Sequence, residues 1–212
     1  MRRVLGLKSL SSTSVAAAVL AVLSIGVPSL GLAASPPQGE HGTFPYVHVH
    51  ALVMDAGGKT LWMGTHHALL RSDDAGETWK EVKVSPRHSK LEIMSLAPDV
   101  KNPRVIYLGT HEAGVFKTTD GGATWVQMNK NLGGMDINGL AFDPNSTEKL
   151  HAAVRDGAEG IYRTRDGGKN WERVADAPKG EVKALASVNI STGMGGIYLY
   201  AGTTEGLFKS PD

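Results

Sequence analysis

Hydrophobic and polar residues alternate along short segments of this chain, with the period of two that is typical of β-strands. The segments recur in sets of three between residues 46 and 212. Innermost strands are predicted at 47–52, 91–96, 135–140 and 180–185. Second strands are predicted at 61–65, 105–110, 150–154 and 197–203, and third strands at 68–71, 114–117, 160–163 and 206–209. Amphipathic helices of useful length are missing from the pattern, so it predicts an all-β protein.

A short phrase at the end of each third strand repeats every 46 residues. It consists of a hydroxyl residue, an aspartate, a glycine and a closing tryptophan. The complete copies contain Ser72, Asp74, Gly76 and Trp79, then Thr118, Asp120, Gly122 and Trp125, then Thr164, Asp166, Gly168 and Trp171. A fourth copy starts at Ser210 and includes its aspartate, Asp212. A period of this length is typical of β-propeller blades.

The chemistry of this phrase predicts a hairpin turn. A hydroxyl and a carboxylate two residues apart can accept hydrogen bonds from nearby backbone N–H groups, while glycine adopts a positive φ angle. The tryptophan then begins the next strand and packs its ring against the blade. We therefore expect the residues of the phrase to be structural.

The repeated phrase resembles the Asp-box, or bacterial neuraminidase repeat, of sialidases, other propeller glycosidases, sortilin-type receptors and photosystem II assembly factors. The resemblance covers about residues 46 to 212 and implies a β-propeller of four blades, at about 46–90, 91–134, 135–179 and 180–212. The fourth blade lacks the outer strand that a tryptophan would begin. Either four blades close with an incomplete last one, or the chain is part of a larger propeller. Truncation or assembly with another chain is the favoured interpretation.

The N-terminal segment predicts export. Arg2, Arg3 and Lys8 precede an apolar stretch from Val15 to Leu32, and small residues follow, as in a signal peptide spanning residues 1–34. The alternative is an uncleaved membrane anchor. Residues 35–45, rich in proline and glycine, are predicted to be a flexible leader. We expect a secreted or periplasmic protein with no stable membrane span after cleavage.

Charge and cysteine content exclude several classes of function. The formal net charge is +1, and it becomes −2 once residues 1–34 and their three positive charges are removed. This leaves no basic field for nucleic acid. The absence of cysteine excludes disulfides and thiolate metal sites. Signatures of serine or cysteine nucleophiles, phosphate loops and zinc-protease helices are also missing.

The sequence differences between the repeats cluster where the innermost strand begins and where the second strand ends. In a propeller these positions lie on one face, close to the axis. The predicted ligand face consists of His48, His50, His66, Glu92, His111, Asp136, Arg155 and Glu181. Such a face fits two kinds of chemistry.

The first kind is metal binding. His48 and His50, with His66 or His111, offer three imidazole nitrogens for zinc or copper. A methionine nearby, Met94, favours copper because a thioether is a soft ligand. The simpler alternative is a set of polar side chains that serve solubility.

The second kind is glycoside hydrolysis by a pair of carboxylates, for which Glu92, Asp136 and Glu181 are the candidates. A sialidase also needs an arginine cluster, and here Arg155 is the single arginine at a suitable position. The sequence thus favours a binding or assembly module with a protein, glycan or metal partner over an enzyme. A glycoside hydrolase other than a typical sialidase is the alternative.

Overall fold

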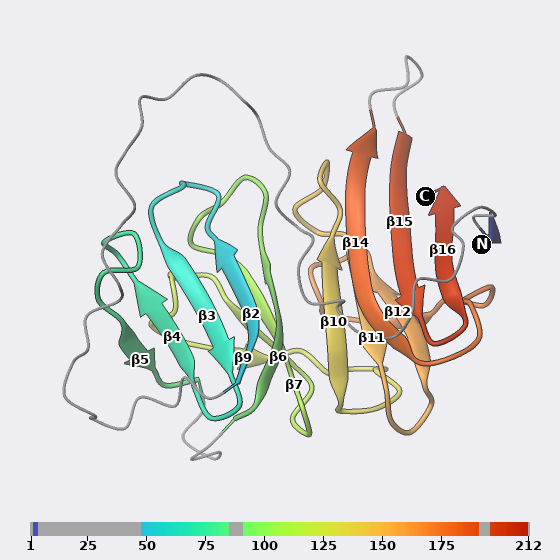
Figure 1. The fold of residues 1–212 in the computed structure, drawn as a ribbon, viewed down its shortest axis with the longest axis horizontal. Coiled ribbons are helices and arrows are strands. Elements are labelled where there is room, and N and C mark those ends of the chain that lie inside the picture. The colour runs from blue at the N-terminus through green and yellow to red at the C-terminus, as the bar shows by residue number, and fades with distance from the viewer. Residues whose placement is uncertain (1, 4–47, 85–90, 191–195, 212) are drawn as a thin grey trace, which may run out of the picture. The chain divides into compact units, whose positions relative to one another are not determined.

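The computed structural model describes residues 2–3, 48–84, 91–190 and 196–211. Within these ranges every regular element is a strand, and the strands form four antiparallel sheets (Figure 1). The predicted all-β fold agrees with this arrangement. No helix among these residues has the length and hydropathy that crossing a membrane requires. The predicted leader and nearly all of the predicted signal peptide lie outside the described residues.

Each sheet is one blade and comes from one sequence repeat. Blade 1 contains β2 (Val49–Met54), β3 (Leu61–Thr65), β4 (Leu69–Ser72) and β5 (Lys80–Val82). Blade 2 contains β6 (Ile93–Pro98), β7 (Ile106–Thr110), β8 (Val115–Thr118) and β9 (Val126–Gln127). Blade 3 contains β10 (Ile137–Phe142), β11 (Leu150–Val154), β12 (Gly160–Thr164) and β13 (Glu172–Arg173).

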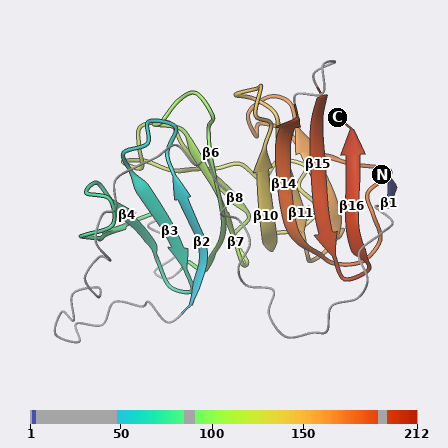
Figure 2. The same ribbon diagram turned by 45° about the horizontal axis from the view of Figure 1, so that its top comes forward.

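Blade 4 has three strands from its own repeat: β14 (Val182–Ile190), β15 (Gly196–Thr203) and β16 (Gly206–Pro211). The outer edge of β16 pairs with β1 (Arg2–Arg3), a strand of two residues, and Figures 1 and 2 both show β1 beside β16. The fourth blade therefore lacks the outer strand that its own repeat would supply, as the sequence predicted.

The innermost strands begin two residues later than the sequence pattern predicted, and each has a β-bulge directly after its first residue. The register shifts between Val49 and Ala51 in β2, and at the matching place in β6, β10 and β14. The bulged residues are His50, Met94, Asn138 and Lys183. A bulge leaves one residue outside the ladder and changes the direction of its side chain, so alternation alone does not tell where these four point.

The hydrophobic core lies between neighbouring blades. One cluster joins blades 1 and 2 around Trp62 and Ile93, and a second joins blades 2 and 3 around Tyr107 and Ile137. A third joins blades 3 and 4, with Val182 among its members. Each blade is thus held by the burial of apolar surface against the next one, which is the main favourable term in folding.

The repeated phrase forms the turn between the third and the outer strand. In the first copy, Ser72 Oγ donates to Asp74 Oδ1 at 2.7 Å and accepts from the Gly76 N–H at 2.8 Å. Asp74 Oδ1 also accepts from the Thr78 N–H at 2.9 Å, and its other oxygen accepts from the Thr78 hydroxyl. The corresponding bonds recur in the second and third copies.

These hydrogen bonds stabilise the ionised aspartates. The side-chain and backbone bonds from Thr78 lower the pKa of Asp74 to about 2, and those from Asn170 lower the pKa of Asp166 to about 2. Bonds from Thr124 hold the pKa of Asp120 well below its ordinary value. The aspartates therefore hold the turns as carboxylate anions at neutral pH.

Candidate ligand face

One backbone hydrogen bond recurs in all four blades and defines equivalent positions. It runs from the residue that follows the second strand to the residue that precedes the innermost strand. The four pairs are His66 N to His48 O (3.1 Å), His111 N to Glu92 O (3.0 Å), Arg155 N to Asp136 O (2.9 Å) and Thr204 N to Glu181 O (3.1 Å). We call these eight residues, with the four bulged residues beside them, the ligand face. Because successive strands reverse direction, it lies at the end of each blade opposite to the repeated turns.

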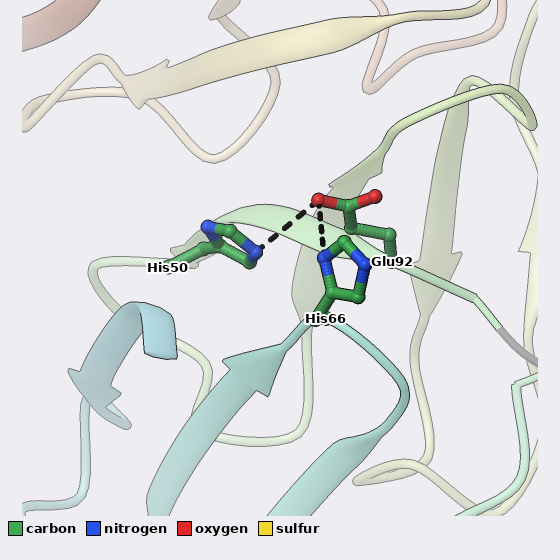
Figure 3. Close-up of side chains that lie close together, drawn as sticks. All are labelled: His50, His66 and Glu92. Carbon is green, nitrogen blue, oxygen red and sulfur yellow. Dashed lines mark ion pairs between the residues drawn. The ribbon is translucent and has the colours of Figure 1, made fainter. Parts of the chain in front are cut away.

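The first group of side chains on this face joins blades 1 and 2. Glu92 Oε1 lies 2.9 Å from His66 Nδ1 and 3.3 Å from His50 Nε2 (Figure 3). His50 is the bulged residue of β2, His66 follows β3, and Glu92 directly precedes β6. The ring of His48 lies 5.8 Å from that of His66, measured between centroids.

Burial lowers the pKa of His50 from its ordinary value, and the nearby His66 and His48 act in the same direction, while Glu92 opposes the change. His50 is therefore inclined to the neutral imidazole form, which keeps a lone pair on one ring nitrogen.

The second group joins blades 2 and 3 around Asp136, whose side chain is almost wholly buried. Its Oδ2 accepts from Arg155 Nε at 2.8 Å and lies 2.9 Å from His111 Nδ1. Arg155 Nη2 is 2.6 Å from the same oxygen. The other oxygen, Oδ1, is buried and has no hydrogen-bond partner among the described residues. The backbone N–H of Asp136 donates to Asp156 Oδ1 at 2.9 Å.

Blade 4 extends this second group. Glu181 lies 4.0 Å from Arg155 Nη1 and 2.6 Å from the ammonium of Lys183. Lys183 is the bulged residue of β14. The side chains of three consecutive blades thus form one network of alternating charge.

A pocket of about 380 Å³ opens between the two groups. Its wall includes His66 and Glu92 from the first group and His111 from the second, together with Glu112. Glu112 has a φ angle of 126°, which is strained for a residue with a side chain. Strain of this kind is found preferentially at functional sites, so the loop that contains Glu112 is a candidate part of the binding site.

The residues predicted to bind metal lie in two different groups of side chains. His50 and His66 lie together, and Glu92 is the third member of their close group. His111 instead contacts Asp136 and Arg155. His48 contributes a ring beside His66 but is not part of the close group.

The three candidate carboxylates all lie on this face, each with a basic partner. Equivalent spacing in the four repeats also places Asp156 and Lys183 beside these residues. Asp156 accepts from the backbone N–H of Asp136, and Lys183 pairs with Glu181.

Comparison with protein families gives one match. A family model described as Sortilin, neurotensin receptor 3 matches residues 67–188, more than half of the chain. No curated protein matches the chain.

Comparison with solved structures gives propeller proteins. An enzyme of the GH74 type from Niastella koreensis has 24% identity and a TM-score of 0.60, over 79% of this chain and 29% of its own. A structure of YCF48 bound to D1 peptide has 24% identity and a TM-score of 0.54, over 78% of this chain and 50% of its own. YCF48 from Cyanidioschyzon merolae has 16% identity and a TM-score of 0.51. The chain spans half or less of the first two, and at these identities the likeness establishes the β-propeller fold alone.

Proposed function

The chain belongs to the Sortilin-Vps10 family, and we propose that it is a binding or assembly module whose ligand face holds a polypeptide partner. One observation carries the proposal. Positions made equivalent by the same backbone bond carry different charged groups in each blade, whereas the turns at the opposite end repeat the same contacts. The repeated turns meet a structural need that all blades share. The ligand face, where the side chains differ between blades, is the end that can select a partner.

The chemistry of the face supports a polar, charged partner. Histidine and acid dominate on blades 1 and 2, while Arg155 and Lys183 add positive charge on blades 3 and 4. A face on which acidic and basic groups occupy fixed, alternating positions selects the orientation of a charged segment. The description of the family names receptors, and one YCF48 structure contains a peptide, so binding of polypeptides is compatible with the fold.

Chemical cross-linking in the cells that make the protein tests this proposal. The face variant Glu112→Ala/Lys183→Ala removes one exposed acid and one exposed cation. The control variant Glu77→Ala/Lys169→Ala removes the same two residue types from the exposed turns at the other end. We expect a defined set of cross-linked proteins with the wild type and the control, and its loss in the face variant. Identical sets from both variants would contradict the proposal.

A glycoside hydrolase is the second candidate. Glu92, Asp136 and Glu181 occupy equivalent positions of three consecutive blades, as paired carboxylates at the mouth of a site would. Each of them, however, already contacts basic side chains, which is unfavourable for a general acid that must carry a proton. Turnover of a panel of aryl glycosides that is abolished in Asp136→Asn would support this candidate instead.

Export belongs to the same proposal. The positive residues, apolar stretch and small residues of segment 1–34 support a signal peptide and a secreted or periplasmic location. A partner would then be met outside the cytoplasm.

A further inference from the structure

We propose that His50, His66 and Glu92 form a zinc site between blades 1 and 2. The site goes beyond the proposed function, because metal binding here requires no polypeptide partner. Nε2 of His50, Nδ1 of His66 and Oε1 of Glu92 all lie within 4.8 Å of one another (Figure 3). They come from three separate segments: the bulge of β2, the loop after β3 and the residue before β6.

The distances suit tetrahedral coordination. With zinc–ligand distances of about 2.0–2.1 Å, two ligand atoms of a tetrahedron are separated by about 3.3 Å. The distance from His50 Nε2 to Glu92 Oε1 is 3.3 Å, and that from His66 Nδ1 to the same oxygen is 2.9 Å. The two nitrogens lie within 4.8 Å of each other, so side-chain rotations that bring them closer place all three atoms around one ion.

The ligand types favour zinc. Two imidazoles and one carboxylate are a common set for zinc sites with an open fourth position. His66 and Glu92 also line the pocket of about 380 Å³, which gives water or another donor access to that position.

A plain ion pair is the competing account, and the two differ in the position of the protons. An ion pair with Glu92 requires N–H on both facing nitrogens, whereas a metal requires lone pairs there. Imidazole ¹⁵N spectra distinguish the two, since binding of zinc shifts Nε2 of His50 and Nδ1 of His66 and leaves their other ring nitrogens protonated.

The binding experiment uses the full chain, dialysed against Zn²⁺ alone, with bound metal measured by elemental analysis. We expect about one zinc ion per chain. The variants His50→Ala, His66→Ala and Glu92→Gln should each bind at least about tenfold more weakly. The matched controls His48→Ala, His67→Ala and His111→Ala remove histidines of the same face and should keep the metal. Thermal unfolding of every variant without zinc shows whether it is folded.

Several outcomes would overturn the zinc site. They are absence of bound zinc from the wild type, retention of zinc in folded His66→Ala, or loss of zinc in His48→Ala and His111→Ala with retention in Glu92→Gln. The last pattern would restore the all-histidine site expected from sequence.

A different observation carries a second inference, about the packing of one blade on the next. Within the chain, a β-branched residue at the start of each innermost strand fits against a small residue on the second strand of the preceding blade. A Cβ added at Gly64 would lie 2.7 Å from Ile93, and one added at Gly109 would lie 2.6 Å from Ile137. Ala153 and Val182 share one buried cluster at the matching place.

The equivalent positions at the two ends of the series are exposed. Val49 of blade 1 is 49% exposed, whereas Ile93 and Ile137 are fully buried. Leu52 and Met54 on the same strand are exposed as well. On blade 4, Gly202 is partly exposed, and among the described residues a Cβ added there would meet only Ala184, at 3.8 Å.

We infer that β2 of one copy of this chain packs on β15 of a second copy, with Val49 against Gly202. A second copy is the chosen occupant because it carries the complementary surface, in the geometry that the chain uses three times internally. Such a contact joins different surfaces of the two copies, and two contacts of this kind close a dimeric ring.

The absence of cysteine allows a direct test. The single variants Val49→Cys and Gly202→Cys are mixed and oxidised, and a disulfide requires Cα atoms about 4.4–6.8 Å apart. We expect a covalent dimer from the mixture and much less from either variant alone. Light scattering should show a wild-type dimer that Val49→Asp converts to a monomer. The control Val126→Asp, on the exposed outer strand β9, should remain dimeric.

The double variant Val49→Cys/Gly202→Cys is the second arm of the test. A disulfide within one chain of it, without cross-linking in the mixture, would mean that blade 1 closes on blade 4 of the same copy. That result, or a wild type that is monomeric at every concentration, would overturn the inference.

Discussion

At the scale of single residues, Gly76 and Gly122 occupy the same place in two repeats and differ in their surroundings. Both have positive φ angles, 94° and 91°. A Cβ at Gly76 would lie 3.5 Å from the nearest atom, a methyl of Leu61, whereas a Cβ at Gly122 would lie 2.5 Å from the ring of Trp62. Trp62 is fully buried and has the guanidinium of Arg71 over its ring. It therefore has little freedom to move.

We expect Gly76→Ala to cost about 1–2 kcal/mol, because alanine must adopt a left-handed conformation. Gly122→Ala should cost about 1–3 kcal/mol more, because it also overfills the contact between blades 1 and 2. Chemical denaturation of both variants gives the two free energies of unfolding. Equal losses would mean that the ring of Trp62 yields without cost and that the interblade contact is looser than the structure indicates.

At the scale of elements, the sequence predicts strands and turns but not bulges or contacts between blades. The second strands and the turns follow from local rules, so the predicted span 61–65 agrees with β3 and the hydroxyl–aspartate contacts form within five residues. The bulge at His50 has no periodic signal, so the alternation of residues did not predict it. Two neighbours of His111, Asp136 and Arg155, are 25 and 44 residues away, on the next repeat. Such pairings depend on how blades face each other, which local spacing does not encode.

The turns between third and outer strands should make the stability of the fold depend on pH in the acid range. Asp74 and Asp166 have pKa values of about 2 in the fold, below the ordinary 3.8. Their stabilisation is therefore fully present above about pH 4 and is lost as pH falls through about 2. We expect the variant Asp74→Asn/Asp120→Asn/Asp166→Asn to unfold at a lower temperature at neutral pH.

The difference from wild type should narrow between pH 4 and pH 2, because the wild-type aspartates become neutral there. Thermal unfolding followed by circular dichroism across this range measures it. Glu77→Gln is the control, since Glu77 lies in the same first turn and its side chain is exposed. A difference that stays constant with pH would assign the loss to altered hydrogen-bond geometry rather than to charge.

At the scale of the whole molecule, the sequence and the structure imply different fates for the N-terminus. The sequence predicts that residues 1–34 are removed on export, whereas the structure pairs Arg2–Arg3 with β16. A two-residue strand supplies few hydrogen bonds, each worth about 0.5–1.5 kcal/mol. Blade 4 keeps β14, β15 and β16 without it, and the packing of β14 against blade 3 does not involve β1.

We therefore expect a chain that begins at Ser35 to unfold within a few degrees of the full-length chain, because about 1 kcal/mol corresponds to about 2–4 °C for a protein of this size. The exported protein should have the intact mass of a chain cleaved near Ala34, as measured by mass spectrometry after cell fractionation. An exported protein that retains Arg2 and Arg3, together with a large loss of stability in the shortened chain, would instead make β1 a working outer strand of blade 4 and the N-terminal segment part of the mature fold.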